Sequence, residues 1–415
     1  MEKFTGWQYL LIDVANQFGH DKLLFGERIK WVEDNLDTLE DLADQADNKY
    51  LYIKAVQAIR KAQAGIASGH LVGFDATCSG IQVMSTLTGC KAGAEATGLV
   101  NPNVRADAYS AMTKAMNELL GGVGVSISRS AAKQATMTSF YGSKAEPIKL
   151  FGENTPELEA FYQAATKVAP GAWQLLQDLL ASWQPYATMH AWQLPDGYEA
   201  KVKVMSPVEH RIEVEELDGA SFTYQYYENR GTAKGLANAA NVTHSVDAYV
   251  LRCIHRRCNY DANVVQNAHN MMSVVSTSRA IGGGSPRVQP VTDKAIAYYI
   301  DLWERSGMAD VVILPYINEK TVLMLPEDML KALLNITYSM INHKPFEVVT
   351  VHDEFKCHPN YMNHLRQHYI NVFAELAESR VLDMILSDIY GKPGRYGKLS
   401  EDLGDLIRGS NYALC

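Results

Sequence analysis

Apolar side chains recur every three to four residues along most of this chain, which is the pattern of amphipathic helices. Residues 7–66 are expected to be mostly helical, with the clearest periodicity in 27–42 and 48–66. The same pattern predicts helices at 103–120, 129–140, 155–183, 241–259, 293–306 and 326–342. Ser128 is a suitable N-cap for the helix that starts at Arg129, because its hydroxyl can accept a hydrogen bond from the first turn.

Strand patterns are fewer and shorter. Residues 195–227 alternate between apolar and polar positions, and Asp218-Gly219 within them is typical of a hairpin turn. Short apolar runs at 71–74, 311–317 and 346–351 predict strands, the first of them buried. The first of these leads directly into Asp75, and the last ends in His352-Asp353. We therefore expect an α+β fold that is mostly helical.

The composition is that of an ordinary globular protein. The 415 residues are 47% hydrophobic and 20% charged, which suits one large domain with subdomains or two to three smaller ones. No apolar run is long enough for a membrane span, and the first residues do not resemble a secretory signal. The six cysteines are scattered, as expected of reduced thiols. Cys253, His255 and Cys258 lack an evident fourth zinc ligand, so ordinary thiols on a helix are the favoured interpretation.

The net charge of −9 argues against general adhesion to nucleic acid. A nucleic-acid ligand would have to be bound by local basic clusters. The candidates are Lys392, Arg395, Tyr396 and Lys398, and separately Arg252, His255, Arg256 and Arg257. Either cluster could equally be a solvated surface.

Three sequence blocks carry candidate chemistry. Asp75 and Asp353 each stand at a strand end, where a carboxylate can hold a metal, although two unrelated caps would look the same. Between them, a helix repeats a side chain of interest every four residues, at Arg129, Lys133, Met137 and Tyr141. Arg129 and Lys133 occupy its first turns, where free N–H groups and the helix dipole already favour anions such as a triphosphate. The alternative is a surface helix with two solvated cations.

These blocks, residues 73–89, 129–143 and 347–355, resemble in this order motifs A, B and C of the single-subunit DNA-directed RNA polymerases of phages and mitochondria. The resemblance implies a right-hand polymerase fold with palm and fingers and a small antiparallel palm sheet. It implies that Asp75, Asp353 and the carbonyl of Ala76 hold two Mg²⁺ ions for nucleotidyl transfer. It also implies that Arg129 and Lys133 bind the triphosphate and that Lys133 protonates the departing pyrophosphate.

RNA synthesis is favoured over DNA synthesis, although His352-Asp353-Glu354 is the usual motif C sequence of the related DNA polymerases. Those enzymes keep a glutamate where this chain has Gly80 and an aromatic residue where it has Met137. His244 lies in residues 241–247, which resemble the family segment whose histidine senses the ribose 2′-hydroxyl together with the motif B tyrosine, here Tyr141. A family A-like DNA polymerase and a catalytically inactive nucleic-acid-binding scaffold remain the alternatives.

The resemblance extends to other positions along the chain. It implies that Lys22 approaches the triphosphate and that Tyr109 lies near the template. Gly142 and His352 belong to the wording of motifs B and C. Residues 410–415 resemble the family's C-terminal foot, so the chain end at Cys415 is expected to fold back toward the active site.

The family comparison divides the chain into five expected parts. They are 1–100 (start of palm and fingers with motif A), 101–195 (fingers with the motif B helix), 196–260 (a hairpin like the specificity loop, then the His244 helix), 261–326 (a candidate insertion) and 327–415 (palm with motif C, then the foot). The family's N-terminal domain, thumb and DxxGR motif have no counterpart here. We therefore expect a C-terminal catalytic portion, either an expressed fragment or, as we favour, the natural large subunit of a two-chain phage enzyme. A second subunit would supply the missing domains and the DxxGR arginine.

The expected partners are a DNA template, an RNA transcript and ribonucleoside triphosphates, without a membrane, in the cytoplasm (of the host cell if the protein is viral). The hairpin at 208–230 carries Glu209, Glu213, Glu215, Glu216 and Asp218 against Arg211 and Arg230. Acidic strands are poor readers of a major groove. Weak recognition of duplex promoters, and dependence on a promoter-opening helper protein, is therefore our hypothesis.

Overall fold

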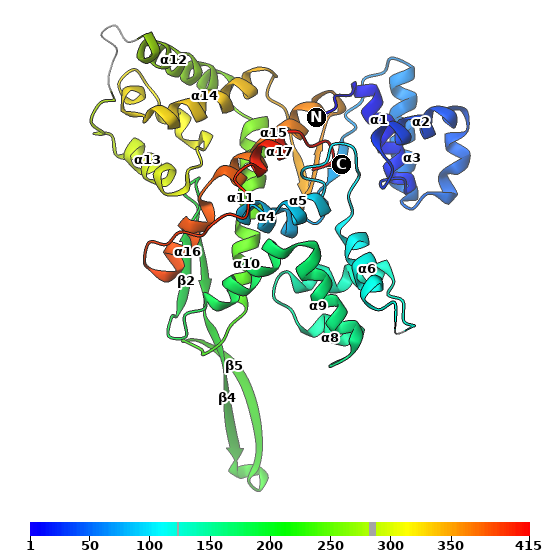
Figure 1. Cartoon of the computed structure of the whole chain (residues 1–415), viewed down its shortest axis with the longest axis vertical. Helices are drawn as coiled ribbons and strands as arrows, with labels where there is room; N and C mark the ends of the chain where they lie inside the picture. Colours follow the sequence, from blue (N-terminus) through cyan, green and yellow to red (C-terminus); the bar gives the residue numbers. More distant parts are fainter. Residues whose placement is uncertain (123, 282–287) are drawn as a thin grey trace.

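The computed structural model describes residues 1–122, 124–281 and 288–415. In this part of the chain most residues are helical, as the periodicity predicts, and the strands form small antiparallel sheets (Figure 1). The first half contains α1 (Gly6–Phe18), α2 (Phe25–Asp34), η1 (Leu36–Gln45), α3 (Lys49–Gln63), α4 (Ser79–Thr88), α5 (Lys91–Ala96), α6 (Ala108–Leu119), α7 (Arg129–Ser139), α8 (Ala145–Phe151), α9 (Pro156–Val168) and α10 (Pro170–Ala181). The second half contains α11 (Ala237–Cys258), α12 (Ala262–Ile281), α13 (Lys294–Ser306), η3 (Val311–Tyr316), η4 (Thr321–Met324), α14 (Glu327–Ile341), η5 (Pro359–Tyr361), α15 (Met362–Glu378), α16 (Val381–Tyr390) and α17 (Leu403–Arg408).

A three-stranded antiparallel sheet joins an early segment of the chain to a late one. Its strands lie in the order β1 (Val72–Asp75), β7 (Glu354–Cys357) and β6 (Val349–Val351). Asp75 is paired with Glu354, and Asp353 lies in the tight turn between β6 and β7. That turn places His352 in the left-handed region, with φ of 56°. Residues distant in sequence therefore meet at one end of this sheet.

The helix capping follows the sequence signals. The Ser128 hydroxyl accepts a hydrogen bond from the amide of Ala131 at 3.3 Å, so the predicted cap of α7 is confirmed. The long helix expected at 155–183 is broken into α9 and α10 at Pro170, because proline cannot donate the backbone hydrogen bond that a continuous helix needs.

The strand predicted at 311–317 is wrong. This segment is the 3₁₀ helix η3, whose start is capped by an Asp310 carboxylate oxygen that accepts from the amide of Val312 at 3.1 Å. Pro315 inside the segment has no amide hydrogen for a sheet. A short apolar run has no periodicity that separates the two structures, and the cap and proline decided it.

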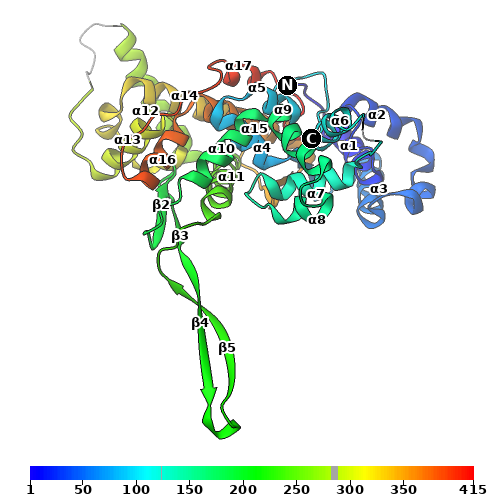
Figure 2. The same ribbon diagram turned by 60° about the horizontal axis from the view of Figure 1, so that its bottom comes forward.

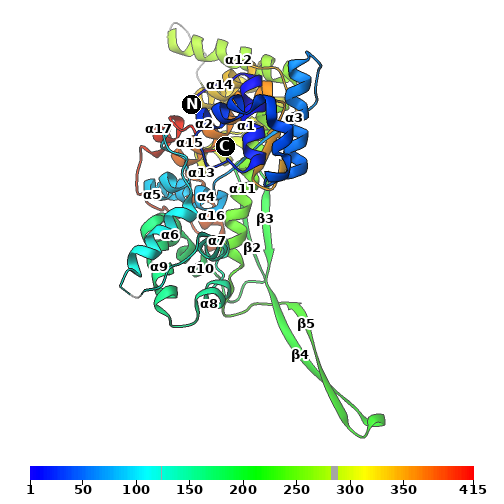
Figure 3. The same ribbon diagram turned by 90° about the vertical axis from the view of Figure 1, so that its right-hand side faces the viewer.

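Two hairpins follow α10. β2 (Met189–Gln193) pairs with β3 (Glu199–Lys203), and β4 (Met205–Val214) pairs with β5 (Ala220–Asn229). Asp218 and Gly219 both have positive φ, so the predicted hairpin turn is confirmed. The β4–β5 pair, residues 205–229, is called the ribbon below, and it extends far from the rest of the molecule in all three views (Figures 1, 2 and 3).

The buried apolar side chains form two cores. The main core contains residues from Phe4 to Cys415 and includes side chains of α1, α4, α11 and α15. The second core is built from α12, α13, α14, η3 and η4, which cluster at one end of the molecule (Figure 1). It extends to Met340, beyond residue 326 where the sequence comparison ended its candidate insertion.

The arginines of one of the two basic clusters form ion pairs with carboxylates of the same chain. Arg252 and Arg256 both bind the Asp196 carboxylate, at 2.7 and 3.1 Å, and Arg256 also binds Asp310 at 2.8 Å. The buried Arg257 binds Glu375 through both of its terminal nitrogens. The three guanidinium groups of this cluster are therefore already paired with carboxylates, so neither a basic surface for a nucleic-acid backbone nor a solvated surface describes them. Within the described residues, no helix has the length and apolar character needed to cross a membrane.

Candidate active site

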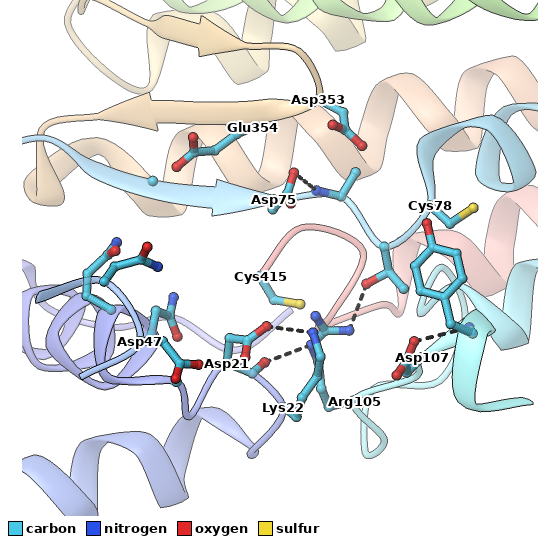
Figure 4. Close-up of a pocket in the computed structure, with 18 of the residues that line it drawn as sticks. Asp21, Lys22, Asp47, Asp75, Cys78, Arg105, Asp107, Asp353, Glu354 and Cys415 are labelled. Carbon is cyan, nitrogen blue, oxygen red and sulfur yellow. Dashed lines mark hydrogen bonds and ion pairs between the residues drawn. The ribbon is translucent and has the colours of Figure 1, made fainter. Parts of the chain in front are cut away.

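A cavity of about 570 Å³ lies at the end of the three-stranded sheet where β1 ends and β7 begins. Its lining comes from α1 and the following loop, β1, α6, α7, the β6–β7 turn and the C-terminus (Figure 4). Segments separated by most of the chain length therefore line one cavity that is open to solvent.

One wall of the cavity is acidic. Asp75 at the end of β1, Asp353 in the turn and Glu354 on β7 all line it. The side chain of Asp75 is exposed to the cavity, but the protein around it partly desolvates the carboxylate. This desolvation, with repulsion from Asp353 and then Glu354, raises the pKa of Asp75 to about 6. Lys356 binds Glu354 at 2.9 Å, whereas no ion pair is found for Asp75 or Asp353 among the described residues. Two carboxylates without a cationic partner in one cavity are suitable ligands for a cation.

The oxygen ligands in this cavity fit Mg²⁺, the metal that the family resemblance implies. Oxygen ligands are what Mg²⁺ prefers, and it commonly takes only one or two carboxylates, with water and substrate phosphates completing its shell. Asp75, Asp353 and the carbonyl of Ala76, which also lines the cavity, could provide the protein's share. Among the described residues there is no cluster of three or more His, Cys, Asp and Glu side chains arranged to hold a metal by themselves.

Cations line the other side of the cavity. Lys22, Arg105, Arg129 and Lys133 all contribute to it, and Figure 4 shows Lys22 and Arg105 across the cavity from Asp75 and Asp353. Arg105 is fixed by a 2.7 Å hydrogen bond to the Thr77 hydroxyl. Asp21 and Asp47 also line the cavity, and Lys22 binds Asp21 at 2.6 Å, so part of the positive charge is already compensated. The remaining cations, together with the acidic wall, can bind an anion that carries a divalent cation, such as a metal-bound triphosphate.

Arg129 is held in place by a partner that sequence reasoning did not identify. Its Nε donates to the Asp107 carboxylate at 2.7 Å, and its guanidinium lies 5.6 Å from the Tyr109 ring centre. The Lys133 ammonium lies at the same distance from that ring. Burial raises the pKa of Asp107, but the hydrogen bonds from Arg129 and Ser110 outweigh it and leave that pKa at about 2. Asp107 therefore stays ionised and orients Arg129 at the cavity edge.

A second cavity, of about 390 Å³, adjoins the first and shares Cys78, Tyr109, Met137 and Asp353 with it. Here Tyr141, in the turn after α7, and His244 of α11 stack face to face, with ring centres 4.6 Å apart and planes at 4°. Gly80 faces this pair, because a Cβ added there would lie 2.4 Å from the Tyr141 hydroxyl oxygen. The tyrosine therefore occupies space that any larger residue at position 80 would need.

Almost all the residues singled out from the sequence line one of these two cavities. Lys22, Asp75, Ala76, Tyr109, Arg129, Lys133, Met137, Asp353 and Cys415 line the first, and Gly80, Tyr141, His244 and His352 line the second. Gly142 is not among the described residues that line either. It has φ of 96°, and an added Cβ would lie 3.4 Å from Leu180, so its place is in the backbone turn after α7.

The C-terminus is part of the site. Leu414 forms an isolated antiparallel bridge with Ala76, and the amide of Cys415 donates to the carbonyl of Asp75 at 3.2 Å. Tyr412 stacks on Phe25 with ring centres 4.7 Å apart. The expected return of the chain end to the site is confirmed, and it fixes the backbone on both sides of the Asp75 carboxylate.

Several site residues were missed from the sequence. Arg105 was not singled out, and Asp107, Glu354 and Asp247 were given no role at the site; Asp247 lies one turn after His244 on α11. Desolvation and the charge of Asp353 raise the pKa of Asp247 to about 6. Asp247 lies in the segment that prompted the interest in His244, and its spacing of three residues on a helix was the available signal.

Comparison with known proteins gives matches to one family. Residues 3–151 match the family model of DNA-dependent RNA polymerase, a segment that contains Asp75 and all of α7. The chain is 30% identical over 172 residues to the DNA-directed RNA polymerase of Pseudomonas phage phiKMV, which covers 33% of this chain and 21% of that protein. It is 26% identical over 184 residues to T7 RNA polymerase of Escherichia phage T7, covering 40% and 19%.

A mitochondrial protein is also similar. The chain is 26% identical over 164 residues to the mitochondrial DNA-directed RNA polymerase of Neurospora crassa, which covers 33% of this chain and 12% of that protein. The chain therefore spans about a fifth or less of the length of these relatives.

Proposed function

We propose that this chain, which is similar over part of its length to DNA-directed RNA polymerases of phages and mitochondria, is the catalytic subunit of a DNA-directed RNA polymerase. The observation that carries the proposal is the first cavity, where two carboxylates without cationic partners face a group of lysines and arginines. The adjoining cavity with the stacked Tyr141 and His244 adds a place for a sugar. The reaction joins a ribonucleoside triphosphate to the 3′ end of RNA on a DNA template.

Asp75, Asp353 and the Ala76 carbonyl would hold two Mg²⁺ ions. When bound, such ions activate the attacking hydroxyl and stabilise the charge on the leaving oxygen. The raised pKa of Asp75 supports this role, because a carboxylate kept near other acids in a poorly solvated place gains most from a cation.

The basic residues would bind and orient the triphosphate. Arg129 and Lys133 lie in the first turns of α7, where backbone N–H groups also favour anions, and Lys22 lines the same cavity. In the reaction the RNA 3′ oxygen bonds to the α-phosphorus, the bond from that phosphorus to the bridging oxygen breaks, and pyrophosphate leaves. The proton of the 3′ hydroxyl passes to solvent, and the Lys133 ammonium donates a proton to the pyrophosphate.

Sugar selection would come from the second cavity. The Tyr141 hydroxyl and the His244 ring can both hydrogen-bond a ribose 2′ hydroxyl, and a site built to pair with a hydroxyl disfavours a substrate that lacks it. Gly80 leaves the space that Tyr141 fills, and Met137 and Tyr109 line the boundary between the two cavities. Tyr109 would contact the template base there.

Within this proposal the three-stranded sheet is the palm and α7 is part of the fingers. The 415 residues contain no DxxGR sequence, and we propose that a second polypeptide supplies an arginine with that role. The mass of the natively purified protein tests the proposal of a second polypeptide independently of the catalytic assignment. A single polypeptide that synthesises RNA alone would contradict it and leave the catalytic assignment intact.

The decisive experiment for the catalytic assignment is primer extension by the natively purified protein on a DNA template, with ribo- and deoxyribonucleoside triphosphates compared. We expect ribonucleotide incorporation that is lost in Asp353→Asn and kept in Asp44→Asn, an exposed carboxylate outside the cavity. Preference for deoxyribonucleotides would instead favour a DNA polymerase, as the His352-Asp353-Glu354 wording allows. Template binding without incorporation of either would favour a scaffold.

A further inference from the structure

The ribbon has an apolar face that the rest of the chain leaves uncovered. Paired residues of antiparallel strands point to the same side, and here Val208 faces Tyr226, His210 faces Tyr224 and Ile212 faces Phe222. The next pair toward the tip is Val214 and Ala220. One side of the ribbon therefore carries a continuous row of aliphatic and aromatic side chains, which we call the apolar face.

The opposite side is polar over the outer part of the ribbon. Its pairs there are Glu209 with Gln225, Arg211 with Thr223 and Glu213 with Ser221, whereas Pro207 faces Tyr227 nearer the base. The alternation in the outer part is typical of a sheet with one side against a protein and the other in water. It differs from a ribbon that is solvated on both sides, which has no reason to segregate its side chains.

Nothing in the described part of the chain covers the apolar face. Every residue of β5 is exposed, including Phe222 at 53% and Tyr224 at 42%. Neither core includes a described side chain from 205–229, and the ribbon extends away from the body in the views of Figures 2 and 3. An isolated two-stranded hairpin is marginally stable in water, so an extended one with exposed aromatic rings gains stability from a cover.

The charge of the ribbon identifies what can cover it. Residues 205–229 carry six carboxylates and a single guanidinium, that of Arg211. Glu228 lies at the base of the apolar face, and Glu215, Glu216 and Asp218 lie at the tip. Acids at both ends of an apolar row disfavour a phosphate backbone and favour a protein surface that is apolar in the middle and basic at its rim.

A second copy of this chain fits poorly. Two ribbons packed through their apolar faces would place carboxylate groups against each other at both ends, whichever way they run. We infer that the apolar face of the ribbon is a docking surface for a different protein, one that presents an apolar patch rimmed by lysine and arginine. This inference concerns the ribbon alone and does not depend on the proposed catalytic activity.

Site-specific photocrosslinking in the cells that naturally make the protein tests the inference. p-Benzoylphenylalanine replaces Phe222 on the apolar face or, as the matched control, the adjacent Thr223 on the polar face. We expect the probe at 222 to give a protein adduct at about tenfold higher yield than the probe at 223. The crosslinked peptide, sequenced by mass spectrometry, is expected to contain apolar residues flanked by lysine or arginine.

Charge reversal at the tip supplies a second measurement. Glu215→Lys with Glu216→Lys is expected to lower the adduct yield from position 222 about tenfold, whereas Glu215→Gln with Glu216→Gln lowers it less. Because the ribbon lies outside both cores, these variants should keep the wild-type unfolding temperature. Equal yields from 222 and 223, no adduct, an adduct to nucleic acid or to a second copy alone, or an acidic crosslinked peptide would each overturn the inference.

Discussion

Replacing Gly80 by alanine tests the arrangement of the sugar-selecting cavity directly. The added methyl carbon would lie 2.4 Å from the Tyr141 hydroxyl oxygen and 2.9 Å from the ring carbon that bears it. Ordinary contact begins near 3.4 Å, so the hydroxyl must move by roughly 1 Å. The ring cannot rotate freely to make room, because it is stacked on His244 with planes at 4°.

The free-energy cost of the added methyl group follows from the packing around Tyr141. Inserting a methyl group into a filled space costs about 1–3 kcal/mol, paid as lost stability or as displacement of Tyr141. If the tyrosine is displaced, the same free energy corresponds to a loss of about 5- to 150-fold in preference for ribonucleotides. We expect Gly80→Ala to show both effects in part, measured as the ribo-to-deoxyribonucleotide ratio of kcat/KM and as the free energy of unfolding.

Two further variants separate the effect of losing a glycine from the effect of the clash with Tyr141. Gly69→Ala, at a glycine with nothing within 4 Å of an added Cβ, controls for the loss of a glycine near β1. Combining Gly80→Ala with Tyr141→Phe removes the oxygen at 2.4 Å, so stability should partly recover while ribose preference stays low. Wild-type stability together with wild-type sugar preference in Gly80→Ala would refute the packing argument.

Three other predictions concern the metal ligands, the fold and the chain end. Asp75→Asn should abolish RNA synthesis but not DNA binding. Mn²⁺ binding to the wild type, measured by electron paramagnetic resonance, should weaken as the pH falls below 6, because the pKa of Asp75 is about 6 and its carboxylate then gains a proton. Arg257→Met should lower the free energy of unfolding in urea by about 3 kcal/mol because it leaves Glu375 unpaired, and adding Glu375→Gln should recover part of the loss. Residues appended after Cys415, whose amide holds the Asp75 carbonyl, should reduce primer extension about tenfold relative to the same tag at the N-terminus, and equal rates would contradict that contact.

Local features of this protein could be predicted from its sequence, because they depend on neighbouring residues. Ser128 caps α7 through its own hydroxyl, and Asp218-Gly219 turns the ribbon because both residues tolerate positive φ. The strand ends at Asp75 and Asp353 were visible as apolar runs that stop at an acid. Where a short run lacked periodicity, as at 311–316, the local signal was ambiguous and the prediction was wrong.

Only the tertiary structure decided which of these groups meet and which charges remain available. Antiparallel pairing of β1 with β7 brings Asp75 and Asp353 to one cavity, and the tertiary fold stacks Tyr141, in the turn after α7, on His244 of α11. Arg256 resembled a free cation in the sequence, yet it binds Asp196 and Asp310. The physical reason is that a hydrogen bond or ion pair depends on distance and desolvation. For residues far apart in the chain, both are set by how the elements pack rather than by sequence spacing.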